Sequence, residues 1–392
     1  MVDEQLSLFH QSIKTSVNLH KNQLFTPNYK YFTPERIILA KGSIDNPERK
    51  DFVRRICSLF PHAAVEKQLD TPHNRINIGA GGDAFGRHVE GKKTLVLGEM
   101  KSPVRFSKES GNTCPNFWHY SVFGFCPYGC AYCYLAGTPG VWYSPSVKIY
   151  VNLTEIIGTI DKQARAIASP VSFYHGKLQD GLALEPIAQY MQTLIPFFAR
   201  HPYARQIILT KSGDIDSLLS LDHCGHTILS WSLNPPEIVS QFEVNTPPIE
   251  ERLQAMKRCS DAGYHVRAVL MPVIPVFEWK QLYSDFLERL LTEIPLDRLT
   301  IGGICSYSHA HGLMIHRLGQ YNPISAHMSG RSSGGDGRRR YSPLLRTEMY
   351  RFLLDTVKII RPDMHVGLCM EDKDIWQAVD PELEIGVCNC VL

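Results

Sequence analysis

Three cysteines in one short stretch carry the strongest chemical signal in this sequence. Cys126, Cys130 and Cys133 stand in the run FCPYGCAYCY with the spacing C-x3-C-x2-C. Thiolates are the usual ligands of iron–sulfur clusters, and a cube of four irons held by three thiolates keeps one iron open. Pro127 and Gly129 oppose a regular helix, so the stretch can wrap a cluster as a loop. The spacing therefore predicts a [4Fe-4S] cluster with one vacant coordination position.

Two other interpretations of the triplet are a zinc ion and three unligated buried thiols. Structural zinc takes four ligands, usually as two short pairs. No second C-x2-C pair follows at finger-like distance. The cluster is the interpretation that the spacing favours.

A second group of cysteines lies near the C-terminus. Cys388 and Cys390 are one residue apart, so in an extended segment their side chains face the same way. With Cys369 they predict an auxiliary iron–sulfur cluster, and Cys305 is a candidate for its fourth ligand or for a catalytic hydrogen donor. The alternatives are a flexible tail with incidental cysteines, and zinc held by these three thiols and a histidine.

The remaining polar candidates have weaker signals. His309, His311 and His316 follow Cys305 in a loop and are candidates for a ligand or acid–base role. Glu371 is a candidate substrate contact. The other cysteines show no ligand spacing and are interpreted as packing residues: Cys57, Cys114, Cys224 and Cys259.

Short apolar runs that alternate with amphipathic stretches must position these residues. They predict βα units around a parallel sheet, after a lead-in with a helix over 46–59 and a strand over 93–98. Strands are predicted over 147–152, 171–174, 206–209, 227–232, 265–271, 299–304 and 365–368. Helices are predicted over 187–200, 249–262, 279–292 and 343–360.

About six such units are too few for a closed eight-unit barrel. The fold class is therefore α/β, a partial (βα)6 TIM-like barrel with an N-terminal α/β extension and a cysteine-bearing C-terminal tail. We expect an arm and small α/β lead-in over 1–115, the barrel over 116–368 and the tail over 369–392. The Gly- and Ser-rich basic stretch 329–340 is predicted to be a flexible loop, with a lid or an anion clamp as the alternative.

Composition limits the class of protein. The 392 residues include 41 basic and 39 acidic side chains, a formal charge of +2, which is too small for the whole molecule to act as a polyanion trap. No segment reaches the roughly 18 uninterrupted apolar residues of a membrane span, and the N-terminus lacks a signal-peptide centre. We expect a cytoplasmic protein without a membrane partner, in which the eleven cysteines serve ligation or catalysis rather than disulfides.

The triplet and the βα pattern that follows it resemble the radical S-adenosylmethionine superfamily. The resemblance implies that the open iron binds S-adenosylmethionine and that one electron cleaves it to a 5'-deoxyadenosyl radical, which abstracts hydrogen from substrate. It also implies an electron donor such as flavodoxin or ferredoxin, and it places Tyr132 near the adenine. A barrel interior that is poor in water suits such a radical.

Within that superfamily the chain looks like the spore photoproduct lyase group from about Tyr31 to Ile304. The resemblance implies cosubstrate contacts at strand ends, from Asp180, Lys211 and Ser232 with Asn234. It is carried by residues 31–35, 93–98, 126–135, 150–153, 209–211, 232–234 and 262–264.

One departure from the lyases affects the expected substrate. The lyases carry a hydrogen-donating cysteine in the loop after the second or third strand, and residues 174–180, YHGKLQD, contain none. We therefore expect a radical enzyme that acts on a small molecule or biosynthetic intermediate. DNA repair of the spore photoproduct type is the alternative, and a non-catalytic iron–sulfur redox sensor is the second alternative.

Overall fold

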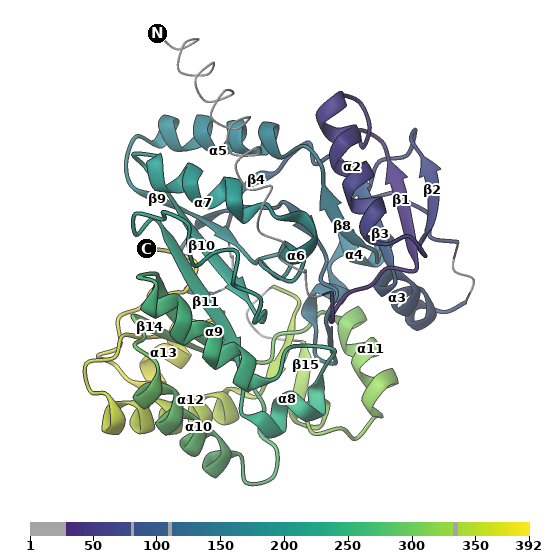
Figure 1. The fold of residues 1–392 in the computed structure, drawn as a ribbon. Helices are drawn as coiled ribbons and strands as arrows, with labels where there is room; N and C mark the ends of the chain where they lie inside the picture. The colour runs from purple at the N-terminus through teal and green to yellow at the C-terminus, as the bar shows by residue number, and fades with distance from the viewer. Residues whose placement is uncertain (1–28, 80–81, 109–111, 332–335) are drawn as a thin grey trace.

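The structure is a computed structural model that describes residues 29–79, 82–108, 112–331 and 336–392 (Figure 1). Nearly all of the predicted N-terminal arm lies outside the described residues. The chain folds around two sheets, and one large apolar core runs between them and their helices. Within the described ranges, no helix is long and apolar enough to cross a membrane.

The N-terminal part is a five-stranded sheet of order β2-β1-β3-β8-β6. The predicted helix over 46–59 is confirmed, and the Asn46 side chain caps it by accepting a hydrogen bond from the Arg49 amide. The Asp83 side chain caps the next helix by accepting a hydrogen bond from the Gly86 amide. The elements are β1 (Arg36–Ala40), α2 (Pro47–Leu59), β2 (Ala64–Gln68), α3 (Ala84–Lys92), β3 (Thr94–Gly98), β6 (Phe123–Gly124) and β8 (Val147–Tyr150).

The main sheet has eight strands in the order β17-β14-β13-β11-β10-β9-β5-β4. Neighbours are parallel from β17 to β5, and only the edge strand β4 is antiparallel. The described strands form an open row, which confirms the partial barrel. The strands are β4 (Val104–Ser107), β5 (Phe117–Tyr120), β9 (Val171–His175), β10 (Ala204–Thr210), β11 (Thr227–Leu233), β13 (His265–Val273), β14 (Arg298–Gly303) and β17 (Val366–Leu368).

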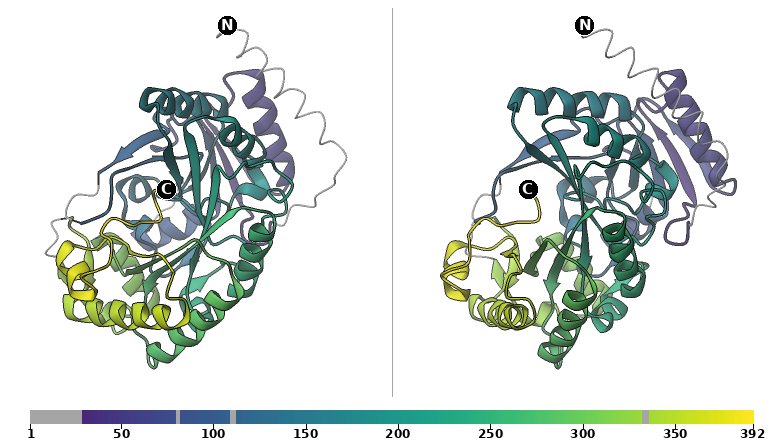
Figure 2. Two further views of the ribbon diagram at one scale, coloured as in Figure 1. Left: turned by 90° about the vertical axis from the view of Figure 1, so that its left-hand side faces the viewer. Right: turned by 60° about the vertical axis from the view of Figure 1, so that its left-hand side comes forward.

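Amphipathic helices cover the outside of this curved sheet (Figure 2). The predicted helices over 249–262, 279–292 and 343–360 are confirmed within one residue at each end. The one predicted over 187–200 is split, because Gln189 has a left-handed backbone with φ 57°. The helices are α4 (Pro139–Tyr143), α5 (Leu153–Ile167), α6 (Glu185–Ala188), α7 (Met191–Arg200), α8 (Pro236–Phe242), α9 (Ile249–Asp261), α10 (Trp279–Glu293), α11 (Ser308–Leu318), α12 (Pro343–Ile360) and α13 (Lys373–Val379), with 3-10 turns η1 (Tyr134–Gly137) and η2 (Ser325–His327).

The strand predicted over 147–152 belongs to a different sheet from the one expected. It forms β8, which pairs with β3 through Leu95 and Val147 in the N-terminal sheet. All four residues of β8 are buried, Lys148 included, and a strand that is buried on both faces carries no information about which sheet it joins. The last strand of the main sheet before the cysteine triplet is β5. β8 lies after the predicted boundary at residue 115 but belongs to the N-terminal sheet. The domain division therefore remains a prediction.

The basic stretch 329–340 is more ordered at its described ends than predicted. Strands β15 (Met328–Arg331) and β16 (Arg339–Tyr341) form an antiparallel pair, and Arg340 binds Asp336 through both guanidinium nitrogens. The hydrogen bond between the Ser306 amide and the Arg339 carbonyl joins this hairpin to the loop after β14. Residues 332–335 lie outside the described residues.

Candidate active site

The cysteine triplet occupies the loop after β5, where the backbone is forced into a compact wrap. Phe125, directly before Cys126, has a left-handed backbone with φ 61°. Cys130 ends the short strand β7 (Gly129–Cys130), which pairs with β12 (Glu243–Val244). A Cβ atom at Gly129 would lie 2.8 Å from the Val244 carbonyl oxygen, so glycine is required for this close approach.

A buried cation lies beside the three thiols. The Lys92 ammonium donates to the carbonyl oxygens of Cys126 and Tyr128. Burial lowers the pKa of Lys92, and the nearby thiols of Cys126, Cys133 and Cys130 act to raise it. Burial also raises the pKa of Cys130 to about 12, so this thiol keeps its proton until a metal replaces it. Three thiols around one positive charge fit the ligand set of an iron–sulfur cluster.

The arrangement of these thiols bears on the zinc interpretation. As the side chains stand in the described part of the chain, no group of three or more His, Cys, Asp or Glu residues could hold a metal ion. A cluster of four irons is larger than one ion, so its ligands stand farther apart. Three thiols from one loop match the three protein ligands of such a cluster and are one short of the four ligands of structural zinc.

Lys211 stands at the centre of a buried polar network beside the triplet. Its ammonium donates to the Ser232 hydroxyl at 2.7 Å, to a Glu243 carboxylate oxygen at 3.1 Å and to the Tyr132 hydroxyl at 3.5 Å. The second Glu243 oxygen accepts from Arg252 at 2.6 Å. Burial alone raises the pKa of Glu243, but the charges of Lys211 and Arg252 outweigh it and bring the pKa to about 2. Glu243 is therefore ionised and fixes the Lys211 cation.

Asp180 is placed next to this network by hydrogen bonds from the chain itself. Its carboxylate accepts from the Thr210 hydroxyl at 2.6 Å and from the amides of Lys211, Leu182 and Ala183 at 2.8, 3.0 and 2.9 Å. Burial nevertheless raises its pKa, against the effect of these donors. Asp180 thus holds the end of β10 and the backbone of Lys211, and a direct cosubstrate contact from it remains a prediction.

Asn234 contributes an unused donor on the same side of the sheet. Its carbonyl oxygen accepts from the Tyr283 hydroxyl at 2.8 Å, and its buried Nδ2 has no hydrogen-bond partner in the structure. A buried amide without a partner costs free energy unless a ligand binds it. The structure therefore brings together Tyr132, Lys211 and Ser232. Asn234 adds a side-chain amide donor that has no partner in the structure. Glu243, Arg252 and Tyr283 had no sequence signal, because they follow no cysteine motif and reach the site through the fold.

The tail cysteines lie together, and a cysteine that the sequence analysis assigned to packing joins them. The thiols of Cys114, Cys369 and Cys390 act on Cys388 at short range and lower its pKa. Cys114 and Cys369 act on each other in the same way, and all four are free thiols. Cys114 was assigned to packing in the sequence analysis and was not placed with the tail thiols. Its spacing of more than 250 residues from Cys369 concealed it, because only the β4–β5 loop brings the two together.

Cys305 stands apart from this group. It is 8% exposed, and its thiol accepts from Arg338 at 3.9 Å. Burial raises its pKa, and the charged groups that act on it are Arg340, Arg338 and Asp336 of the hairpin. None of the tail thiols is among them, so Cys305 as their fourth ligand has no support in these contacts. Its role as a hydrogen donor remains a prediction.

Tyr134 lies between the triplet and the tail cysteines, and Tyr174 lies beside the tail cysteines. Tyr134 follows the triplet and donates to the Lys177 carbonyl oxygen at 2.5 Å. Burial raises its pKa, as do the charges of Cys133 and Cys369. The pKa of Tyr174 is also raised, first by burial and then by the charge of Cys390. Both thiol groups therefore lie within electrostatic range of one set of side chains.

The other predicted candidates have structural contacts. The Glu371 carboxylate is buried and accepts from Arg346 and from the Tyr350 hydroxyl at 2.5 Å, so it holds α12 against β17. His309 packs near Trp142, with ring centroids 5.3 Å apart. His316 stacks on a phenylalanine of α3 with ring centroids 4.2 Å apart.

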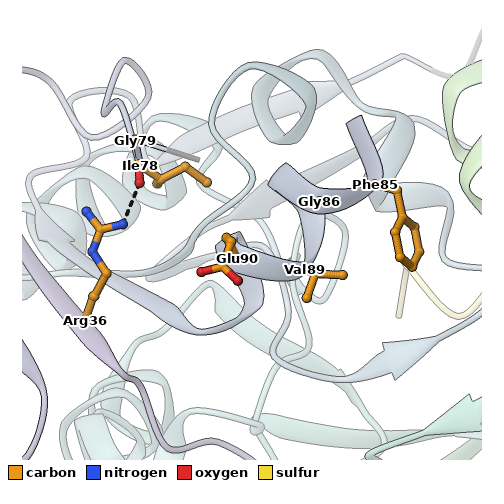
Figure 3. A pocket seen from close by; sticks show the side chains of 7 residues that line it. All are labelled: Arg36, Ile78, Gly79, Phe85, Gly86, Val89 and Glu90. Carbon is orange, nitrogen blue, oxygen red and sulfur yellow. Dashed lines mark hydrogen bonds between the residues drawn. The ribbon is translucent and has the colours of Figure 1, made fainter. Parts of the chain in front are cut away.

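A hollow of about 550 Å³ lies on the N-terminal sheet (Figure 3). No cysteine lines it, and the Arg36 guanidinium at its edge is already bonded to the Ile78 carbonyl oxygen and to Glu66. Figure 3 shows Glu90 and Phe85 of α3 on its other side. It is distinct from the polar network at Lys211.

Comparisons with known proteins agree with this geometry. A family model described as spore photoproduct lyase matches residues 32–304. The spore photoproduct lyase of Clostridium acetobutylicum is 27% identical over 256 residues, 65% of this chain and 73% of that protein. The Bacillus subtilis lyase is 24% identical over 268 residues, 68% of this chain and 75% of that protein.

Solved structures show the same fold. A spore photoproduct lyase complexed with dinucleoside spore photoproduct superposes with a TM-score of 0.74 at 21% identity, over 86% of this chain and 98% of that one. A mutant with bound AdoMet and dinucleoside spore photoproduct gives a TM-score of 0.74 at 20% identity over the same shares. The predicted resemblance is confirmed over the range from which it was drawn. This protein belongs to the spore photoproduct lyase family and is a radical S-adenosylmethionine enzyme with a [4Fe-4S] cluster.

Proposed function

We propose that this enzyme repairs a pyrimidine photoproduct in DNA. The observation that carries the proposal is the family match over residues 32–304, a range that includes the triplet loop and the Lys211 network. The preference for a small-molecule substrate rested on the missing thiol in the loop after β9. The relatives, which are named spore photoproduct lyases, favour the alternative.

Cys126, Cys130 and Cys133 are proposed to hold the cluster. When bound, the cluster and S-adenosylmethionine supply a 5'-deoxyadenosyl radical for hydrogen abstraction. Lys92 offsets part of the negative charge of three thiolates. An external reductant such as flavodoxin or ferredoxin is proposed to provide the electron.

The cosubstrate contacts are proposed to come from the polar network. Asn234 has a free donor for a carboxylate, and Tyr132 has an aromatic face for adenine. Lys211, held by Glu243 and Ser232, presents a fixed cation. Asp180 is proposed to act through its hold on Lys211 and Thr210.

The hydrogen donor that completes repair is proposed to be Cys305. The loop after β9 has Lys177 and no cysteine, so a thiol from elsewhere must replace the usual donor. Cys305 follows β14, whose carboxyl end faces the same side of the sheet as those of β10 and β11. The three tail cysteines are proposed to hold an auxiliary cluster.

A direct assay tests the substrate. The reconstituted enzyme is incubated without oxygen with S-adenosylmethionine, dithionite and a dinucleoside spore photoproduct. Formation of 5'-deoxyadenosine together with restored thymidine residues is expected. If 5'-deoxyadenosine forms and the photoproduct is unchanged, the substrate is not this DNA lesion and the small-molecule hypothesis gains support.

A further inference from the structure

Four thiols, not three, meet where the C-terminal tail packs on the main sheet. Cys388 is 2% exposed, and its thiol lies within interaction range of the thiols of Cys114, Cys369 and Cys390. Cys114 comes from the β4–β5 loop, Cys369 from the end of β17, and Cys388 and Cys390 from the tail. Four soft donors from three separate segments are the ligand set of a metal centre rather than of a packed core.

Each segment is fixed by hydrogen bonds that do not involve the thiols. The Thr113 amide and hydroxyl donate to the Glu371 carbonyl oxygen at 2.8 and 3.0 Å, which ties the Cys114 loop to the chain just after Cys369. The Cys369 amide donates to the Ile301 carbonyl oxygen at 2.7 Å. The four positions are thus set by the backbone.

The tail itself is anchored by polar side chains of the sheet. Ser230 donates to the Asn389 side-chain oxygen at 2.8 Å, and Ser172 donates to the Cys390 carbonyl oxygen at 3.3 Å. Figure 2 shows this last segment, in yellow, returning to the middle of the strands. An extended end held in this way gives Cys388 and Cys390 fixed positions.

Two arginines supply positive charge beside the four thiols. Arg298 donates to the Cys388 carbonyl oxygen at 2.7 Å, and Arg267 donates to the Val391 carbonyl oxygen at 2.7 Å. Arg267 is 6% exposed, and its Nε has no hydrogen-bond partner. The negative groups that act on Arg267 are Asp297, Cys388 and Cys390, and those that act on Arg298 include Cys388 and Asp297. Four thiolates on a centre of charge +2 leave a net charge of about −2, which two arginines balance.

We infer that Cys114, Cys369, Cys388 and Cys390 together ligate a second iron–sulfur cluster that has no open iron. This deepens the auxiliary cluster of the proposed function by adding the fourth protein ligand. A fully ligated cluster has no vacant position for substrate and is held in place by three segments of the chain.

Metal analysis of the full-length protein tests this inference. The protein is purified without oxygen and reconstituted with ferrous iron and sulfide, and iron, sulfide and zinc are measured per chain. We expect about eight irons in the wild type, and about four in Cys114→Ser and in Cys388→Ser. Cys224→Ser, which changes an exposed cysteine outside the group, is the matched control and should keep about eight.

A complementary variant guards against misfolding. The triple variant Cys126→Ala/Cys130→Ala/Cys133→Ala should keep about four irons with the absorption and electron paramagnetic resonance of a cubane. The inference is overturned if the wild type binds only about four irons, if Cys114→Ser loses none, or if the second site contains zinc. Because metal content is measured without a substrate, failure here is distinguishable from failure of the repair assay.

Discussion

The Lys211 ammonium lies 3.1 Å from a carboxylate oxygen of Glu243, and the Glu243 side chain is fully buried. Arg252 binds the other oxygen, so one carboxylate balances two cations beside the cysteine triplet. β12, which carries Glu243, pairs with β7, which carries Cys130. The charge that fixes Lys211 is therefore attached to the same backbone that shapes the cluster loop.

Replacement of this carboxylate should destabilise the protein strongly. Glu243→Gln leaves two buried cations uncompensated, and we expect a loss of about 3–5 kcal/mol in the free energy of unfolding, measured with urea under anaerobic conditions. Glu250→Gln removes an exposed partner of Arg289 and should cost at most about 1 kcal/mol. Equal losses in the two variants would refute the role of Glu243.

The same variant predicts a pH dependence. The pKa of Glu243 falls from 4.5 to about 2 in the folded protein, because the attraction of Lys211 and Arg252 exceeds the cost of burial. A lowered carboxylate pKa contributes stability that is complete above pH 4.5 and is lost as the pH falls toward about 2. The difference in the free energy of unfolding between wild type and Glu243→Gln should therefore become smaller as the pH falls over this interval. A difference that stays constant would show that charge is not its cause.

Removal of one triplet thiol should abolish cluster binding there. Cys126→Ala is expected to lose about four irons per chain and to form no 5'-deoxyadenosine from S-adenosylmethionine and dithionite. Circular dichroism should remain that of the wild type, because Cys126 lies in a small cluster of loop residues outside the large core. Full iron content in this variant would remove the triplet as the ligand set.

Local patterns predicted most elements of this fold, and long-range contacts account for what they missed. The helix Pro343–Ile360 was predicted with its correct ends, because Ser342 and Pro343 mark its start and apolar residues repeat along it. The triplet was identified from its spacing alone. By contrast, no local signal relates Cys114 to Cys388, or Glu243 to Lys211. The sheet membership of β8 was also hidden, because its residues are buried on both faces.

Cys305 should separate cosubstrate cleavage from product formation. We expect Cys305→Ala to keep its iron and to form 5'-deoxyadenosine, and to lose repair of the photoproduct by about 100-fold or more, as for removal of a catalytic proton or hydrogen donor. Its contacts are with Arg338 and not with the tail thiols, so no iron should be lost. Loss of about four irons would reassign Cys305 as a ligand, and full repair activity would exclude it as the donor.

Lys148 should make stability rise between neutral and alkaline pH. Its buried ammonium donates to the carbonyl oxygens of Ser144 and Ser146 at 2.7 and 2.8 Å, and burial lowers its pKa from 10.5 to about 7. The unfolded chain keeps this proton to higher pH, so stability increases as the folded form releases it. Relative to Lys148→Met, the wild type should gain about 2 kcal/mol from pH 7 to pH 9 in urea unfolding. No relative gain would show that Lys148 has an ordinary pKa.

Gly367 offers a way to displace the tail without changing a cysteine. Gly367 lies in β17, and a Cβ atom there would overlap the Val387 carbonyl oxygen, one residue before Cys388. Gly367→Ala must push this segment outward, at a cost of about 1–3 kcal/mol. If the tail completes the second cluster, this variant should lose about four irons while Cys126, Cys130 and Cys133 keep theirs. Gly158→Ala in α5, where no atom lies within 4 Å of the added carbon, is the control and should keep both clusters. Full iron content in Gly367→Ala, together with the expected loss of stability, would mean that the docked tail is not needed for the second site.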